Sequence, residues 1–384
     1  MRRTGEVGWI LFLAGLPFAP FLDRRLDLWH GQAQWAIGWV GILWLWSIEQ
    51  PAVHRMNKSF LAWSLYGFGF FFVSLWQGVA VAKAYPILML IACSHFLCII
   101  FFYQAALAFW TPAFLESLCR WVARASACMV VYGFLQICQA DPWLKNFDHD
   151  QAKNGLHSLL IGTLGNPDHL GAYFAMTLPL VWLYRRFWRW RIILAGQVVL
   201  LGWLAIGSQV IGGLVAALAV LLWSVWRRSP RLAYGFGGFL CCIGGILLWK
   251  HPGVIDSNGR FAAWAAFWPL SAQHIAFGTG PGAVLALSQT VTDAAIKGWG
   301  HCHNEYLQVL LEQGLIGLGL VAWGIAATIQ RARQLPQTPL VLALSGTGIA
   351  FLVNSFYNFP AHLWVLSSLG LLAYCGLWTL DTSC

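Results

Sequence analysis

The residue types best suited to chemistry gather in one polar stretch, residues 250–312, of a chain that is otherwise strongly apolar. Near the end of this stretch lie His301 and His303, directly before an apolar run that starts at Glu305. The first turn of a helix presents unpaired N–H groups with positive character, which disfavour protonation of a nearby imidazole. His303 is therefore a candidate proton acceptor, with a histidine that only caps the helix as the alternative.

Two acidic side chains follow on the predicted helix. Glu305 and Glu312 are seven residues apart, so they share one helix face with Gln308 between them. A carboxylate as deep in a membrane span as Glu312 costs about 2–3 kcal/mol unless it faces a polar cavity or a partner. We expect this face to point to the protein interior, either as a binding surface or as a structural hydrogen-bonding group.

Arg260 is a candidate anion-binding residue, because it is the only arginine of this stretch and lies in a glycine-containing turn. A guanidinium can hold a phosphate through paired hydrogen bonds, or it can anchor a lipid headgroup. The glycine-rich run at 278–282 would allow the backbone to approach such a ligand closely.

A metal site is a further possibility at His301 and His303, whose spacing suits two ligands on one loop. Glu305 or the acidic cluster at 148–150 could add ligands, but no set of four is defined by spacing. We therefore predict no metal and no cofactor.

Membrane helices must position these residues. Of 384 residues, 59% are hydrophobic and 10% are charged, and the mean hydropathy is +0.65. A soluble domain carries about 25% charged residues, and about 20 apolar helical residues cross a bilayer. The sequence predicts an all-α, polytopic membrane protein with about twelve transmembrane helices and two longer periplasmic loops. The predicted spans are 6–22, 33–49, 60–80, 85–109, 121–139, 168–184, 192–208, 210–226, 232–249, 305–329, 338–356 and 361–379.

The distribution of positive charge predicts the orientation. With the N-terminus in the cytoplasm, the cytoplasmic side holds 15 of the 23 Lys and Arg residues, in the shorter loops. Because cytoplasmic loops carry an excess of Lys and Arg, we predict that both termini are cytoplasmic. The net charge of +9 is spread in short clusters between spans, which argues against nucleic-acid binding.

Only two inter-span segments are long, 140–167 and 250–304, and both fall on the outer side. We divide the chain into N-terminal transmembrane helices at 1–139 and a core at 140–384 that contains both segments. The cytoplasmic loops are too short for a nucleotide-binding domain, and the sequence has neither a Walker motif nor GxGxxG after a strand. Asn166 is expected to cap the helix that Pro167 begins.

Four short motifs resemble, in the same order, those of the O-antigen ligase-like (Wzy_C) superfamily. They are Gly165-Asn166-Pro167, Gly259-Arg260 with Trp264, the turn from Phe277 to Gly282, and His303-Asn304-Glu305-Tyr306-Leu307 followed by Glu312-Gln313-Gly314. The resemblance covers about 155–380, whereas the first 150 residues match only in hydropathy.

The resemblance implies a metal-independent glycosyltransferase of the GT-C type in the bacterial inner membrane, with a periplasmic active site. Such enzymes take a glycan from a polyprenyl-diphosphate donor in the membrane lipid and pass it to lipid A–core, to another glycan chain or to a protein hydroxyl. Arg260 would bind the donor diphosphate and His303 would activate the acceptor hydroxyl, so both are catalytic candidates. The substrate-binding candidates are Arg260, Asn304, Glu305, Tyr306, Glu312, Lys250 and Lys297.

The chain departs from the family pattern at one turn. Members often have Ser-Arg between the seventh and eighth spans, whereas this chain has Gly207-Ser208-Gln209. Either Lys250, Lys297 or Lys153 replaces that arginine, or the donor is bound differently. We expect a ligase, with a glycan polymerase or a protein O-oligosaccharyltransferase as alternatives. A twelve-span transporter, the alternative from another class, should have internal repeats or paired broken helices, and we find no repeat.

Overall fold

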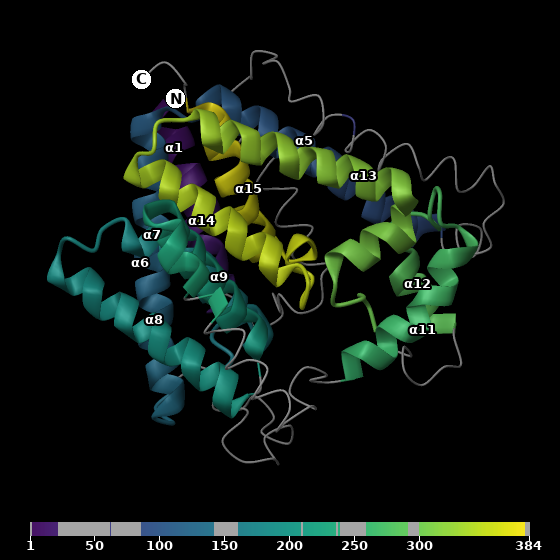
Figure 1. Ribbon diagram of the computed structural model, residues 1–384, viewed down its shortest axis with the longest axis horizontal. Helices are drawn as coiled ribbons and strands as arrows, with labels where there is room; N and C mark the ends of the chain where they lie inside the picture. Colours follow the sequence, from purple (N-terminus) through teal and green to yellow (C-terminus); the bar gives the residue numbers. More distant parts are fainter. Residues whose placement is uncertain are drawn as a thin grey trace.

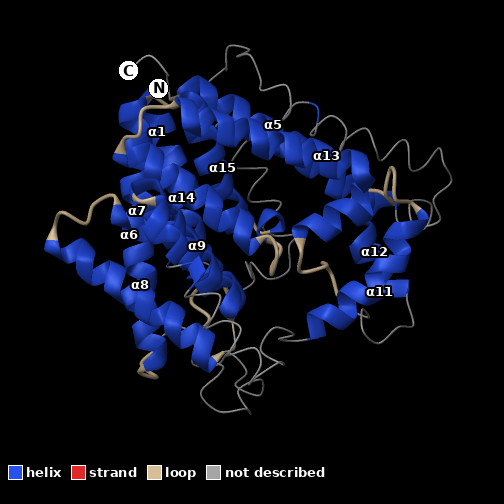
Figure 2. Ribbon diagram, in the orientation of Figure 1, coloured by secondary structure: helices blue, strands red, loops and turns tan. Residues whose placement is uncertain are grey.

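The computed structural model describes residues 2–21, 62, 86–141, 160–208, 210–235, 237–238, 259–290 and 299–380. Within those residues the chain is all-helical and contains no strand (Figure 2). The predicted spans at 33–49, 60–80 and 232–249 fall wholly or mostly outside them, as does most of the predicted loop at 140–167.

Helices occupy the other predicted spans. They are α1 (Arg2–Ile10), continued by a π-helical turn (Leu11–Gly15) and a 3-10 turn (Leu16–Phe21), α5 (Pro86–Phe109), α6 (Pro112–Ile137), α7 (Pro167–Trp182), α8 (Trp188–Gly207), α9 (Ile211–Arg228), α11 (Arg260–Gln273), α12 (Ala283–Thr290), α13 (Glu305–Gln334), α14 (Pro339–Asn354), a 3-10 turn (Pro360–His362) and α15 (Trp364–Thr379).

Four of these helices, α6, α8, α9 and α13, are long and apolar enough to cross a membrane. Shorter apolar helices lie at Gly5–Phe18, Cys98–Phe109, Pro339–Asn354 and Trp364–Thr379. The described part is thus an all-α protein with helices of membrane-spanning length and composition. The count of twelve spans stays a prediction.

The bundle is built around α14, which packs against α7, α9 and α15 (Figure 1). A polar contact joins three neighbouring helices inside it: Gln197 of α8 donates to Ser126 of α6 at 2.8 Å and to Thr177 of α7 at 3.0 Å. Because unsatisfied polar groups are costly in hydrocarbon, such side chains bond across helices and hold them together. All three are fully buried.

Helix boundaries follow local signals. Thr111 caps α6 by accepting from the N–H of Phe114 at 3.3 Å, and Pro112 takes the first position, where no N–H is needed. The predicted span at 121–139 is therefore part of a longer helix that begins at Pro112. Likewise, the predicted outer segment at 250–304 is not an extended loop throughout, since it contains α11 and α12.

The helix α13 is broken at Gly314, where φ is +67° and ψ is −166°. The segment before α12 fills the break. The N–H groups of Leu315 and Ile316 donate to the carbonyls of Ile275 at 2.8 Å and Ala276 at 3.3 Å. The sequence predicted one continuous span at 305–329, and this prediction is corrected: glycine takes a positive φ at no steric cost, and the inserted segment pairs the freed backbone groups.

The same segment also pairs the carbonyls before the break. Thr279 donates its N–H to Leu311 O at 2.9 Å, and Gly280 donates to Glu312 O at 2.8 Å. Gly278 makes this approach possible, because a Cβ there would lie 2.4 Å from the carbonyl carbon of Glu312. The glycine-rich run, read from sequence as a possible ligand cradle, therefore packs on the backbone of α13.

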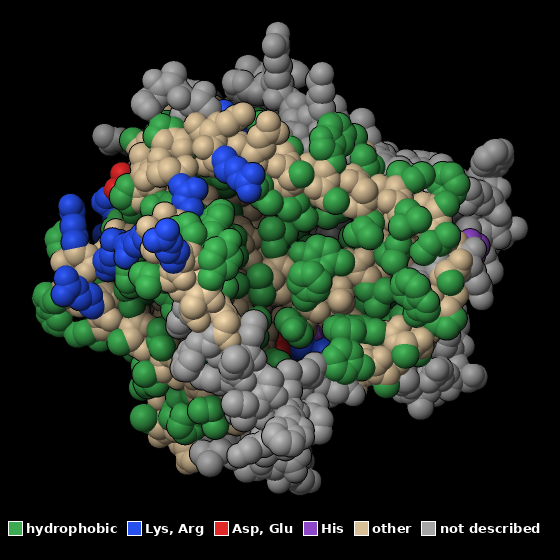
Figure 3. All heavy atoms as spheres, viewed as in Figure 1, with side chains coloured by type: hydrophobic (Ala, Val, Ile, Leu, Met, Phe, Trp, Pro, Cys, Tyr) green, Lys and Arg blue, Asp and Glu red, His purple; other side chains and the backbone are tan. Residues whose placement is uncertain are grey.

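The two ends of the bundle differ in charge. Arginine side chains gather at the end formed by the start of α6, the α7–α8 turn and the ends of α9 and α13 (Figure 3). They are Arg120, Arg124, Arg185, Arg186, Arg189, Arg191, Arg227, Arg228, Arg331 and Arg333. At the opposite end, Arg260 is the only arginine whose side chain the structure describes. This is the asymmetry on which the predicted orientation rests.

Candidate functional site

Four chain segments far apart in sequence meet at the arginine-poor end of the bundle. They are the first turns of α7 and α11, the segment 299–304 that enters α13, and the connection between α14 and α15. The two small helices α11 and α12 stand beside the main bundle and are joined to it through α13 (Figure 1). Most of the polar side chains singled out from the sequence come together here.

Arg260, the first residue of α11, forms a buried ion pair with Asp168. Its Nη2 lies 2.7 Å from Asp168 Oδ2, and the two side chains are 5% and 15% exposed. Asn166 caps α7 as predicted, accepting from the N–H of Asp168 at 2.7 Å, and so fixes the residue that carries this carboxylate. The bond engages one of the five N–H donors of the guanidinium, which leaves the others available to an anionic ligand.

His303 lies beside this pair in a strained conformation. Its φ is +50°, in the left-handed region that costs a non-glycine residue about 1–3 kcal/mol. Its Nδ1 is buried and has no hydrogen-bond partner among the described residues. Burial, the charge of Arg260 and the neighbouring His169 lower the pKa of His303 to about 3. The ring is therefore neutral at physiological pH, with a nitrogen free to accept a proton.

His303 does not cap α13. Asn304 does, by accepting from the N–H of Leu307 at 3.0 Å. The reading of His303 as the capping residue is thus wrong: the short Asn side chain closes the cap, and the histidine ring turns toward Trp299, at 5.0 Å between ring centroids. Residues in such strained backbone conformations cluster at functional sites.

Phe359 holds the histidines of the site in place. The ring of His301 stacks on it at 4.3 Å, while His303 and His169 meet it edge-on at 4.7 and 5.4 Å. Burial and the neighbouring His362 and His303 keep the pKa of His301 well below its usual value. A low-dielectric aromatic environment thus keeps this part of the site uncharged.

A second polar pair lies next to it. The carboxylate of Glu305 accepts from His362 Nδ1, 3.0 Å from Oε2, and from the N–H of Ala361 at 2.7 Å. Burial lowers the pKa of His362, but the contact with Glu305 and the charge of Glu312 outweigh it, so the pKa of His362 is raised. Glu305 therefore fixes the α14–α15 connection against the start of α13.

Gln308 lies between His301, His362 and Glu312, on the helix face that the spacing predicts. Its Nε2 lies 3.2 Å from Glu312 Oε1, 3.2 Å from His362 Nε2 and 3.4 Å from His301 Nδ1. Its Oε1 accepts from the N–H of Cys302 at 3.2 Å, which orients the amide. The amide has two hydrogens for these three neighbours, so Gln308 can donate to at most two of them at a time.

The prediction that this helix face points to the interior is confirmed, because Glu305, Gln308 and Glu312 are 6%, 3% and 5% exposed. Glu312 also accepts from the N–H of Val284 at 3.3 Å, in the first turn of α12. It thereby fixes α12 to α13, a structural contact of the kind expected of a buried carboxylate.

The remaining sequence candidates divide into two groups. Tyr306 faces α14, where its hydroxyl donates to Leu352 O at 2.8 Å, and so it points away from Arg260. Lys250, Lys297 and Lys153, together with Gln209 and the acidic cluster at 148–150, lie outside the described residues. Among the described residues, no three or more His, Cys, Asp or Glu side chains are arranged to hold a metal ion.

The helix α11 presents an apolar face outward directly beside Arg260. Phe261 and Trp268, seven residues apart and so on one face, are 44% and 53% exposed, and Ala265 between them is exposed too. The opposite face, with Ala263 and Phe267, packs into a small core with Val284, Cys302 and Leu311. An exposed apolar track therefore leads to a buried cation.

Four members of the site were not predicted from the sequence: Asp168 as the partner of Arg260, His169, His362 and Phe359. Asp168 lies in the first turn of the helix that the sequence predicts to begin at Pro167. The pairing of Asp168 with Arg260 could have been inferred from one signal: an acidic residue at the outer end of a predicted span needs a partner, and Arg260 is the arginine of the outer segment at 250–304. His362 and Phe359 lie in a short turn with no motif, so only the fold brings them to His301.

A comparison of the chain with protein-family models found no matching family, and a comparison with curated proteins found no match either.

Proposed function

We propose that this protein is a glycosyltransferase that moves a glycan from a polyprenyl-diphosphate donor to an acceptor hydroxyl, at the end of the bundle where Arg260 and His303 meet. The carrying observation is the neutral His303 ring, with an unpartnered buried nitrogen, beside a buried arginine. The proposal also rests on the motif resemblance to the O-antigen ligase-like superfamily. The orientation that follows places this end in the periplasm of a bacterial inner membrane.

Arg260 would bind the diphosphate. A guanidinium that is 4% exposed is already stripped of most water, so its attraction for phosphate oxygens is strong. Asp168 holds it by one N–H and leaves its other donors for paired bonds to phosphate. As the sugar–oxygen bond to the diphosphate breaks, negative charge grows on the leaving group, and Arg260 would stabilise that charge.

His303 would take the proton of the acceptor hydroxyl. The hydroxyl oxygen attacks the anomeric carbon, its proton passes to the imidazole, and the bond from that carbon to the diphosphate oxygen breaks. A bound diphosphate would offset the positive charge of Arg260, which lowers the pKa of His303 in the free protein. The donor would thus make His303 a stronger base when the substrate is present.

The apolar outer face of α11 supports a lipid-linked donor over a soluble one. A polyprenyl chain could lie along Phe261 and Trp268 in the hydrocarbon, with its diphosphate at Arg260. The buried pair Glu305–His362 would hold the acceptor side of the site together. No step needs a nucleotide, because the diphosphate ester is already an activated leaving group.

A transporter is the less supported alternative. Broken membrane helices often mark transport sites, and α13 is broken at Gly314. However, the backbone groups at this break bond to the segment containing Ile275 and Gly280, so they are not presented to a substrate. The choice among ligase, polymerase and protein O-oligosaccharyltransferase depends on the acceptor, and we favour the ligase.

The test is transfer of a glycan from a purified polyprenyl-diphosphate donor by the reconstituted protein. Arg260→Ala should lower kcat/KM by about 10²–10³-fold, the usual loss for a group that stabilises transition-state charge. His303→Ala should lower kcat by about 10²–10⁴-fold, with the donor KM little changed. Lipid A–core, glycan and protein acceptors are offered in parallel to choose among the three enzyme classes.

Matched controls separate the site from general damage. Arg227→Ala removes an exposed arginine at the far end of the bundle, and His274→Ala removes an exposed histidine at the end of α11. Both should retain activity. Full transfer by the Arg260 and His303 variants, at normal membrane expression, would show that the site lies elsewhere.

A further inference from the structure

A cavity lies at the opposite end of the bundle from the histidine cluster. Its walls are the start of α6, the α7–α8 turn, and the α13–α14 connection with Leu335 and Thr338. The chain of α13, broken at Gly314, runs from Glu305 in the histidine cluster to Gln334 beside this cavity. The cavity volume is about 1530 Å³, enough for a lipid headgroup and part of a chain.

The cavity is strongly cationic. Six arginines line it, and the only acidic side chain in its wall is Glu116. The arginines are Arg120, Arg124, Arg185, Arg186, Arg189 and Arg191. Glu116 lies 3.5 Å from Arg120, and no other ion pair to these arginines occurs within the part of the chain that the structure describes. The wall thus carries a large uncompensated positive charge.

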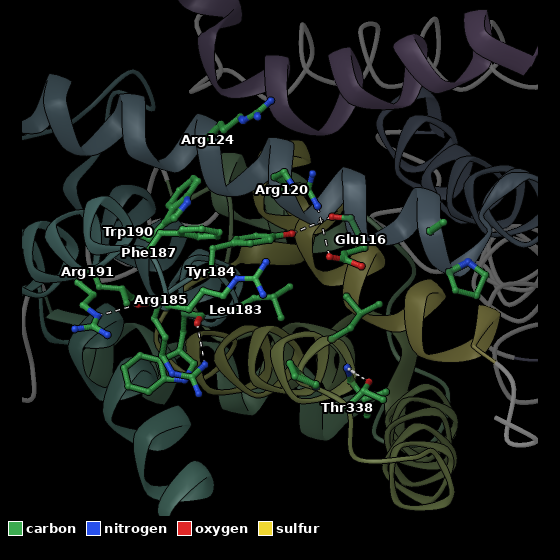
Figure 4. Close-up of a pocket in the computed structure, with 18 of the residues that line it drawn as sticks. Glu116, Arg120, Arg124, Leu183, Tyr184, Arg185, Phe187, Trp190, Arg191 and Thr338 are labelled. Carbon is green, nitrogen blue, oxygen red and sulfur yellow. Dashed lines mark hydrogen bonds and ion pairs between the residues drawn. The ribbon is translucent and has the colours of Figure 1, made fainter.

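Figure 4 shows how the cavity is arranged: Arg120 and Glu116 on one wall, Thr338 on the opposite wall, Tyr184 between them and Arg191 toward one edge. Tyr184 is held in place by its hydroxyl, which donates to Glu116 O at 3.0 Å. The helix α8 also begins here, without a side chain that caps its first N–H groups. An uncapped helix start favours an anion.

The rest of the wall is apolar. Leu183, Trp190, Leu194, Leu340 and Val341 lie between the arginines and the bundle. A free phosphate would use only the arginines and leave this surface in contact with water. A ligand with an anionic head and an apolar chain uses both, and basic pockets between membrane helices hold such lipids.

We propose that this cavity binds an anionic phospholipid of the leaflet on that side, with the phosphate among the arginines and an acyl chain against the apolar wall. The site is independent of the proposed transfer reaction, since its residues and those of the histidine cluster lie at opposite ends of the same helices. Its occupant would brace α6, α7, α8 and α14 where their ends meet.

The test places the full-length protein in phosphatidylcholine nanodiscs doped with phosphatidylglycerol and measures retained lipid by native mass spectrometry. The triple variant R120Q/R185Q/R191Q should retain phosphatidylglycerol at least about tenfold more weakly, because each arginine near a headgroup contributes about fivefold in affinity. The matched control is R227Q/R228Q/R231Q. It removes the same charge at the same end from exposed positions that do not line the cavity.

Three results would overturn the proposal. An equal loss of phosphatidylglycerol binding in the two triple variants would mean that diffuse surface charge, not this cavity, attracts the lipid. Equal thermal stabilisation by inorganic phosphate would assign the cavity to a soluble anion, and equally tight binding of a polyglutamate peptide would assign it to an acidic polypeptide. Unfolding of the cavity variant is checked by gel filtration, and R120K/R185K/R191K, which keeps the charge, should retain most of the binding.

Discussion

Gly278→Ala tests the contact that organises the proposed active site, the insertion of the segment before α12 into the break of α13. A Cβ at this position would lie 2.4 Å from the carbonyl carbon of Glu312 and 2.5 Å from the nitrogen of Gln313. Both are backbone atoms, so no side-chain rotation can relieve the overlap. Gly278 also has a φ of +80°, where an L-residue is strained.

The two costs can be separated by matched substitutions. Left-handed strain costs about 1–2 kcal/mol, and overpacking against a fixed neighbour costs about 1–3 kcal/mol, so Gly278→Ala should destabilise by about 2–5 kcal/mol. Gly259→Ala carries the strain alone, because φ is +71° and no atom of the described residues lies within 4 Å of its Cβ. It should lose about 1–2 kcal/mol. Gly300→Ala meets only Leu285 at 3.6 Å and should be nearly neutral.

Denaturant titration of the three variants in detergent, under identical conditions, measures how much stability each one loses. The expected ranking of lost stability is Gly278 far above Gly259, and Gly259 above Gly300. Equal losses at Gly278 and Gly259 would refute the reasoning, because they would mean that the segment does not press on the backbone of α13.

Two further predictions concern pH. The pKa of His303 is lowered to about 3 in the folded protein, so between about pH 6.5 and 3 only the unfolded chain binds this proton, and the free energy of unfolding falls as the pH falls. His303→Asn should remove about 2 kcal/mol of the stability that the parent loses between pH 7 and 5, measured as the free energy of unfolding at each pH. An unchanged dependence of that free energy on pH would contradict the buried neutral ring. The pKa of His362 is raised, so its pairing with Glu305 contributes stability below about pH 6.5 that is lost as the pH rises through the raised pKa. His362→Gln should therefore lower the free energy of unfolding, relative to the parent protein, most at low pH. A difference in unfolding free energy that grows toward alkaline pH would rule out the charged pair.

Much of the fold could be predicted from the sequence, because the bilayer imposes simple rules. Apolar runs of sufficient length, bounded by Pro and by capping residues such as Asn166, placed most helices of the described part within a few residues. The spacing of Glu305, Gln308 and Glu312 placed them on one face, since helix geometry is local. The clustering of arginines at one end of the bundle could likewise be predicted from the positions of Lys and Arg between the spans.

Long-range contacts could not be predicted in this way, because they depend on how helices pack. The pairing of Arg260 with Asp168 joins residues 92 positions apart, and the three histidines around Phe359 come from two separate segments, the start of α7 and the segment before α13. The break in α13 could not be predicted either, because a glycine such as Gly314 within an apolar run does not indicate that a distant segment pairs the backbone groups freed by the break. Composition and spacing thus determined the helices and the candidate residues. Only the tertiary structure decided which of them touch, since a buried charge or an open backbone group is stable only where the fold supplies its partner.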